Sequence, residues 1–336
     1  MLRTAIRATD DGFQADALPL VRSLAPSRRA ASLPDDFGAL SALTDCDLHG
    51  CEYLTSLPDC ISNLAMLTRL DANYCTNLNS VPECIGSLTV LVTLDLSQCF
   101  SLTSLPDSIG GLAALTALDL TLTTLDLGSC TVLYNFPSSI GSLAALAKLD
   151  LGNCDTLSSL PESVGGLTAL TWLNLSGLRR LPNSIGQLVS LATLNMTRCR
   201  TLKSLPDSIG ALVSLTHLRL SSCKRLTSLP DTIGALQSLR VLDLRACEAL
   251  TALPDSIGNL AALAELNLRS CRRLPELPDS LGELAPLTSL DLTACSELES
   301  VPDTFGKLVL LTKIHTDGCQ ECLTHAASAL QQRNLA

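Results

Sequence analysis

The chain has 336 residues, of which 46% are hydrophobic but only 3% aromatic, and its formal net charge at pH 7 is −10. An acidic, aliphatic composition argues against a nucleic-acid-binding surface, because phosphate recognition needs a basic face. Every apolar run is shorter than the roughly 20 residues that a membrane-spanning helix requires. These properties predict a soluble protein with a core of aliphatic side chains.

The first residues lack the apolar stretch of a secretory signal peptide, and Asp10, Asp11 and Asp16 argue against a transit peptide. We therefore expect a cytoplasmic protein. Fifteen cysteines in a long chain of this kind are expected to be reduced thiols rather than a disulfide framework.

A proline, usually preceded by leucine, recurs along most of the chain. Nine of the eleven intervals between these prolines are 24 residues, and the other two are 31 and 21. The series is Pro34, Pro58, Pro82, Pro106, Pro137, Pro161, Pro182, Pro206, Pro230, Pro254, Pro278 and Pro302. A fixed period of this length indicates a stack of about 12 repeats. It predicts an N-terminal flank or cap over residues 1–32, a solenoid over 33–319 and a C-terminal cap or tail over 320–336.

The sequence of one repeat suggests its structure. Leu218-x-Leu220 has the period-two spacing of a short strand, which directs the leucines inward and Arg219 outward. The Pro-Asp-x-Ile-Gly segment that starts at Pro230 favours a short helical turn, since proline suits its first position. Glycine follows eleven of the twelve prolines by four residues, and Ser62 is the exception. We expect this glycine to permit close packing or a tight bend.

Most of the cysteines share one position, three residues after the last strand leucine or its equivalent. They are Cys51, Cys75, Cys99, Cys130, Cys154, Cys199, Cys223, Cys247, Cys271, Cys295 and Cys319. A thiol tolerates burial and can hydrogen-bond to a loop backbone. We therefore predict a structural role for this cysteine column.

The repeats resemble the leucine-rich-repeat regions of plant intracellular nucleotide-binding immune receptors, whose units often read LxxLxLxxCxxLxxLPxxIGxL. The phrases LTSLPDSIGGLAALTALDL (residues 102–120) and LKSLPDSIGALVSL (residues 202–215) carry this resemblance. It implies an α/β leucine-rich-repeat solenoid, or horseshoe, with a concave parallel β-sheet and short 3-10 or α turns on its convex side. No GxxxxGK[ST] phosphate-binding loop is present, which suggests a stand-alone repeat protein or a fragment.

The outward strand residues change character along the chain. Asp95, Asp119, Asp126 and Asp150 form a carboxylate column, which either attracts a basic partner segment or simply keeps the face hydrated. Further along, a basic patch suited to an acidic peptide is predicted on the same face. Its residues are Arg198, His217, Arg219, Arg240, Arg245 and Arg269. Residues 1–168 hold 7 Lys+Arg against 18 Asp+Glu, a net charge of −11, whereas residues 169–336 hold 16 against 15, a net charge of +1.

Trp172 is the only tryptophan, and it precedes a Leu-Asn-Leu strand phrase beside the shortened repeat. It is either an anchor for a binding partner or a side chain that packs over its neighbours.

The pattern His315-x3-Cys319-x2-Cys322-x2-His325 has the residue types of a metal site. However, Cys319 and His315 already have places in the repeat, so we expect no metal and no cofactor. No catalytic constellation stands apart from the repeat pattern, so we also expect no enzymatic activity.

The leading hypothesis is a non-enzymatic, monomeric scaffold that binds a protein or peptide on the concave face in defence or signalling. One alternative is a bacterial-type effector or ligase adaptor in which the repeats deliver a catalytic partner. The other is a structural spacer. Nucleic acid and membrane are not expected partners.

Overall fold

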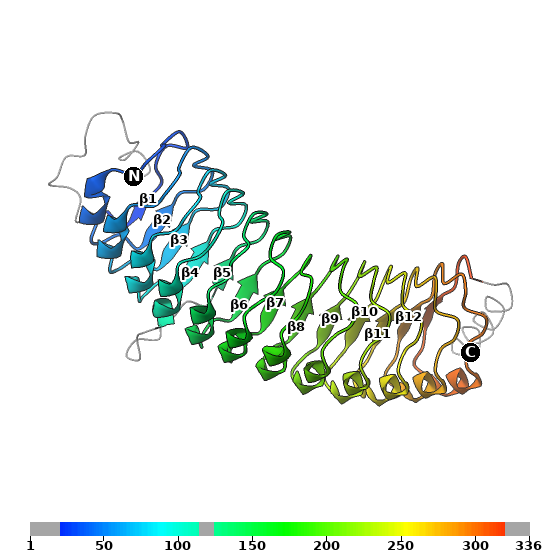
Figure 1. The fold of residues 1–336 in the computed structure, drawn as a ribbon. Coiled ribbons are helices and arrows are strands. Elements are labelled where there is room, and N and C mark those ends of the chain that lie inside the picture. The colour runs from blue at the N-terminus through cyan, green and yellow to red at the C-terminus, as the bar shows by residue number, and fades with distance from the viewer. Residues whose placement is uncertain (1–20, 114–123, 320–336) are drawn as a thin grey trace. The chain divides into compact units, whose positions relative to one another are not determined.

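The computed structural model describes residues 21–113 and 124–319. The chain divides into two compact units, Met1–Leu170 (unit 1) and Thr171–Ala336 (unit 2). In both units, three-residue strands alternate with short 3-10 turns (Figure 1). We treat each unit separately.

Unit 1 contains six of the described strands, five of them three residues long. They are β1 (Ser23–Leu24), β2 (Asp45–Asp47), β3 (Arg69–Asp71), β4 (Thr93–Asp95), β5 (Thr124–Asp126) and β6 (Lys148–Asp150). Its 3-10 turns are η2 (Asp35–Ala39), η3 (Asp59–Asn63), η4 (Glu83–Ser87), η5 (Asp107–Ala113), η6 (Ser138–Ser142) and η7 (Glu162–Gly166).

Unit 2 contains seven described strands of the same length. They are β7 (Trp172–Asn174), β8 (Thr193–Asn195), β9 (His217–Arg219), β10 (Val241–Asp243), β11 (Glu265–Asn267), β12 (Ser289–Asp291) and β13 (Lys313–His315). Its turns are η8 (Asn183–Gln187), η9 (Asp207–Ala211), η10 (Asp231–Ala235), η11 (Asp255–Asn259), η12 (Asp279–Glu283) and η13 (Asp303–Lys307).

The strands of each unit form a parallel sheet in chain order, as the repeat period predicts. Leu218 pairs in register with Leu242, and Leu242 with Leu266. The two irregular intervals leave this register intact, because Thr93 pairs with Thr124 and Trp172 with Thr193. The stack begins earlier than the first Leu-Pro pair, since β1 lies within the predicted flank and pairs with β2.

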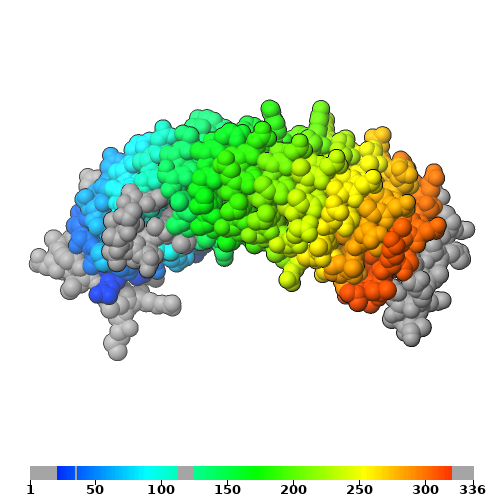
Figure 2. All heavy atoms as spheres, turned by 90° about the horizontal axis from the view of Figure 1, so that it is seen from below, coloured from blue at the N-terminus to red at the C-terminus, as the bar shows by residue number. Residues whose placement is uncertain are grey.

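Leucines fill the inside of every rung, a term we use for one strand with the turn that follows it. In the rung of β9, Leu215, Leu218, Leu220 and Leu226 are fully buried. The turn adds Ile233, whose N–H donates to the Pro230 carbonyl at 2.9 Å. This i to i+3 hydrogen bond defines a 3-10 turn. In the space-filling view, successive rungs of each unit adjoin as bands of colour (Figure 2).

The cysteine column has the structural role that its position predicts. Each thiol donates to a backbone carbonyl of the preceding rung, as Cys223 Sγ does to Met196 at 3.2 Å and Cys247 Sγ to Leu220 at 3.3 Å. In the rung of β7, which lacks the cysteine, the buried Leu178 occupies the same position. The column therefore ties neighbouring rungs together on the inside of the loop that follows each strand.

This burial predicts slow thiol chemistry in the folded protein. Burial raises the pKa of Cys99, Cys154 and Cys295 to about 12, so the reactive thiolate is scarce at neutral pH. We expect a maleimide to label the half-buried Cys60, Cys84 and Cys319 first and the buried column cysteines only after denaturation. Mass spectrometry of labelled peptides would show this order, and rapid native labelling of Cys99 or Cys154 would contradict it.

Candidate ligand-binding surface

The exposed face of each sheet carries the residues on either side of the buried strand leucine. In most rungs the third residue of the strand is aspartate or asparagine. The side chain of this residue has a structural function that the sequence did not predict. Its Oδ1 accepts the N–H of the residue two positions later, at 2.8 to 3.1 Å. The residues that do so are Asp47, Asp71, Asp95, Asp126, Asp150, Asn174, Asn195, Asp243, Asn267 and Asp291. The column therefore fixes the start of each post-strand loop.

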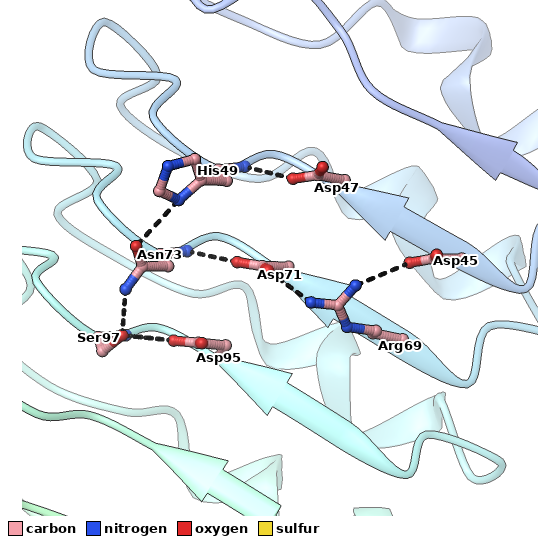
Figure 3. Close-up of polar contacts among 8 residues, drawn as sticks. All are labelled: Asp45, Asp47, His49, Arg69, Asp71, Asn73, Asp95 and Ser97. Carbon is pink, nitrogen blue, oxygen red and sulfur yellow. Dashed lines mark hydrogen bonds and ion pairs between the residues drawn. The ribbon is translucent and has the colours of Figure 1, made fainter. Parts of the chain in front are cut away.

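In unit 1, these side chains belong to a polar ladder across three rungs (Figure 3). His49 Nδ1 lies 2.9 Å from Asn73 Oδ1, and the Asn73 amide donates to the Ser97 hydroxyl. Arg69 bridges Asp71 at 2.8 Å and Asp45 at 3.7 Å. One guanidinium thus neutralises part of the carboxylate column near β2 and β3.

The carboxylates nearer β5 are less well compensated. Desolvation by burial, together with the carboxylates of Asp150 and Asp95, raises the pKa of Asp126 to about 6, against the lowering effect of the Gly128 N–H. Asp95 and Asp126 are direct register partners. Asp119, which the sequence analysis placed in the same column, lies outside the described residues.

Replacing Asp126 with asparagine is expected to stabilise the protein at pH 7. The amide keeps an oxygen for the Gly128 N–H, as Asn174 and Asn195 do in equivalent positions, and it removes the repelled charge. The gain should be about 1 kcal/mol, after discounting the shift for solvent screening. Because the pKa of Asp126 is raised in the folded state, its ionised carboxylate increasingly destabilises the wild type as the pH rises from about 4 to 6. The stabilisation by asparagine should therefore vanish below that pH range.

Urea unfolding of the Asp126→Asn variant and the wild type at pH 7.5 and pH 4 would measure this difference. Asp243→Asn is the matched control, because Asp243 lies beside the Arg245 guanidinium at 3.9 Å rather than among carboxylates. A stabilisation that persists unchanged at pH 4 would contradict the electrostatic explanation.

In unit 2, β9 departs from the column. Arg219 occupies the position that aspartate or asparagine fills in the neighbouring strands, and its side chain is exposed. His217 lies in the same strand, with Nδ1 2.8 Å from the Thr216 hydroxyl. Since that hydroxyl donates to the Ala192 carbonyl, Nδ1 is the donor of the pair. Arg219 therefore replaces, in β9, the aspartate or asparagine whose Oδ1 accepts a loop N–H in the neighbouring strands.

Three other predicted arginines lie near Arg219, and one does not. Arg245 and Arg269 each follow the third strand position by two residues in adjacent rungs, which places them roughly 4.8 Å apart along the stack. Arg198 lies in the loop after β8 and is exposed. Arg240 precedes β10 and so lies at the opposite end of that strand.

Most of the basic surface of unit 2 lies outside the positions that the sequence predicted. We define the loop edge of unit 2 as residues 176–180, 197–203, 221–227, 245–251, 269–275 and 293–299. It contains eleven Lys or Arg residues, all exposed, and three Glu residues. The basic residues are Arg179, Arg180, Arg198, Arg200, Lys203, Lys224, Arg225, Arg245, Arg269, Arg272 and Arg273. A basic residue directly after Cys199, Cys223 and Cys271 was the sequence signal that could have revealed it.

The acidic residues of unit 2 gather elsewhere. Each turn from η9 to η13 begins with an exposed aspartate, on the side of the rung away from the loops. The near-neutral charge of this half of the chain therefore conceals a basic loop edge and an acidic turn edge. Separated charge of this kind orients a charged partner.

Trp172 opens β7 and is half-buried. Its strand neighbours are a buried Leu173 and Asn174, so the indole flanks the exposed face of the unit 2 sheet. This position is compatible with both sequence hypotheses for Trp172.

No group of three or more His, Cys, Asp or Glu side chains within the described ranges is arranged to hold a metal ion. Cys319 of the C-terminal pattern donates to the Leu292 carbonyl at 2.9 Å, as a column cysteine does, while Cys322 and His325 lie outside those ranges. The same ranges contain no helix long and apolar enough to cross a membrane.

Comparison with known proteins agrees with this architecture. A family model described as a leucine-rich repeat region matches residues 120–219 and 194–332, together more than half of the chain. No curated protein matches. Among solved structures, a leucine-rich-repeat protein of Leptospira interrogans is 29% identical with a TM-score of 0.63, over 92% of this chain and 81% of its own.

Two further structures are similar. The leucine-rich-repeat domain of the type III effector XopL is 27% identical with a TM-score of 0.51, over 69% of this chain and 70% of its own. The Drosophila Toll–Spatzle complex contains a chain that is 19% identical with a TM-score of 0.56, over 89% of this chain and 36% of its own. That last likeness concerns the fold alone. The chain thus belongs to the leucine-rich-repeat proteins, whose repeats generally serve protein–protein recognition.

Proposed function

We propose that this chain is a non-enzymatic scaffold that binds an acidic segment of a partner protein on the sheet face and loop edge of unit 2. The observation that carries the proposal is the gathering of eleven exposed Lys and Arg side chains on that loop edge. Arginine pairs well with carboxylates through its planar guanidinium. Arg219 supports the proposal, because it stands where the two neighbouring strands carry Asn195 and Asp243.

Defence or signalling is the proposed setting, and the cytoplasm the proposed compartment. All fourteen cysteines in the described ranges are free thiols, which supports a reducing compartment. The similarity to the effector XopL favours a second candidate, in which the scaffold delivers a catalytic partner to its target. Both versions require the same docking surface.

Trp172→Ala provides the test of this surface. The probe is a fluorescein-labelled peptide of alternating glutamate and leucine, whose carboxylates suit the arginines and whose leucines suit the indole. We expect the substitution to weaken binding about 30-fold, or roughly 2 kcal/mol, with an unchanged circular dichroism spectrum. Equal affinity of the variant and the wild type, measured by fluorescence anisotropy, would remove Trp172 from the surface. Failure of the wild type to bind would contradict the proposal itself.

A further inference from the structure

The loop edge of unit 1 has a different composition from that of unit 2. In the loops after β2 to β6, residues 49–55, 73–79, 97–103, 128–134 and 152–158, it includes no Lys or Arg, whereas the loop after β1 carries the exposed Arg28 and Arg29, with Arg28 beside Gly50. All three tyrosines of the chain lie in the loops after β2 to β6, with Phe100 and Val132. Tyr53 is 58% exposed and Tyr134 65%, while Tyr74, Phe100 and Val132 are each nearly 40% exposed. We call these five residues the aromatic edge.

The aromatic edge is continuous across four neighbouring rungs. The Gly50 N–H donates to the Asn73 carbonyl, the Tyr74 N–H to Ser97 and the Gln98 N–H to Gly128, so successive loops are stacked by backbone hydrogen bonds. The rings of Tyr74 and Phe100 meet edge to face, with centroids 6.2 Å apart. The rings of Tyr74 and Phe100 thus form a pair, and Tyr53 and Tyr134 lie in the loops on either side of it.

The fold does not require these side chains. Relative to the column cysteine, Tyr74 stands at the preceding position, where Ser129, Ser222 and Ser270 occur with the same positive φ. Phe100 stands at the following position, which Ser296 fills in another rung, and Tyr53 stands one further on, where Ser101 occurs. Exposed aromatic rings at positions that accept serine indicate a binding function.

Apart from Arg28 and Arg29 in the loop after β1, the charge around the aromatic edge is negative. Glu52 and Asp155 lie in the same loops, and the carboxylate column of the sheet begins where each loop starts, as Asp71 and Asp95 show in Figure 3. Arginine and lysine are attracted both to carboxylates and to the faces of tyrosine rings. This environment is complementary to a cationic partner and repels an acidic one.

We propose that the aromatic edge is a second docking surface, which binds a partner segment in which arginine or lysine alternates with apolar side chains. Its rings cover the apolar side chains and stack on the guanidinium groups, and the neighbouring carboxylates neutralise the cationic charge. It is separate from the basic surface of unit 2 and selects the opposite charge.

The test compares two triple variants at matched positions of the full chain. Tyr53→Ser/Tyr74→Ser/Phe100→Ser removes three rings without changing the net charge. Arg225→Ser/Arg198→Ser/Arg200→Ser is the control, because its residues occupy the same three loop positions in unit 2. The probes are fluorescein-labelled peptides of alternating arginine and leucine, and of alternating glutamate and leucine.

We expect the aromatic variant to bind the arginine–leucine peptide at least about tenfold more weakly than the wild type and to bind the glutamate–leucine peptide as the wild type does. The control variant should keep its affinity for the arginine–leucine peptide. Equal binding of that peptide by the aromatic variant and the wild type would overturn the proposal, since attraction by net charge alone would then explain it. Absence of binding by the wild type would also overturn it.

A different occupant of the aromatic edge would be the basic loop edge of a second copy of the chain. Sedimentation equilibrium of the same proteins tests for this self-association. We expect the wild type and the aromatic variant to have the same mass. A wild-type dimer that the aromatic variant converts to a monomer would assign the surface to self-association and overturn the proposal as stated.

Discussion

Replacement of Gly282 by alanine is expected to lower the free energy of unfolding by about 3 kcal/mol, the upper part of the usual cost of overpacking. A Cβ on Gly282 would lie 2.5 Å from the carbonyl oxygen and from the Cβ of Thr304 in the next turn. Neither is the free end of a flexible side chain, so η12 and η13 would have to separate. The glycine that the sequence shows four residues after nearly every proline is therefore needed for close packing of the turns.

Urea unfolding followed by circular dichroism would measure this cost, with Ser62→Gly as the control. Ser62 holds the equivalent position in η3, where its hydroxyl donates to the Asp59 carbonyl of the same turn at 2.9 Å. That pair of turns already accommodates a side chain, so the control should change stability by less than about 1 kcal/mol. An unchanged unfolding midpoint for Gly282→Ala would show that the turns can move apart at little cost.

Charge reversal at Arg245 and Arg269 is expected to weaken binding of the glutamate–leucine peptide at least about 100-fold at low ionic strength. The two exposed side chains follow equivalent positions of β10 and β11, so each substitution places a carboxylate where the peptide would present its own. The loss should shrink as salt is added, because exposed charges are screened.

Asp255→Arg/Asp279→Arg provides the matched control for Arg245→Glu/Arg269→Glu. Asp255 and Asp279 open η11 and η12, on the turn edge away from the loops, so they change the net charge without changing the proposed surface. The control should shift affinity by less than about threefold, through long-range attraction alone. Because the control raises the net charge by as much as Arg245→Glu/Arg269→Glu lowers it, a gain in affinity as large as that loss would indicate binding by net charge.

Except for β1, the sequence was sufficient to predict the strands, the short turns and the cysteine column. Each depends on one side chain recurring every 24 residues, and a stack in register turns that period directly into a column. The long repeat was harder, because Leu118-Asp119-Leu120 and Leu125-Asp126-Leu127 are equally good strand phrases. The structure pairs Asp126 with Asp95.

The candidate site was only partly predictable. The sequence predicts that Asp126 and Asn174 are polar strand residues that face outward. The hydrogen bonds that they accept from the N–H groups of residues 128 and 176 depend on the path of the loop backbone, which the sequence does not show. The recurrence of aspartate and asparagine in this column was the available signal, since both carry Oδ1. The loop edges were missed because the sequence analysis followed the inter-leucine positions, whereas Arg225 and Tyr53 lie beyond the cysteine.

In the proposed complex, a partner docks on the sheet face and loop edge of unit 2 and not on its turn edge. The most direct measurement is site-specific photo-crosslinking of the glutamate–leucine peptide from benzoylphenylalanine placed at Val241 or at Val213. Val241 opens β10 on the sheet face, and Val213 is 57% exposed just after η9. We predict crosslinks from position 241 and none from position 213. Crosslinking from position 213 at an equal or higher yield would contradict the account.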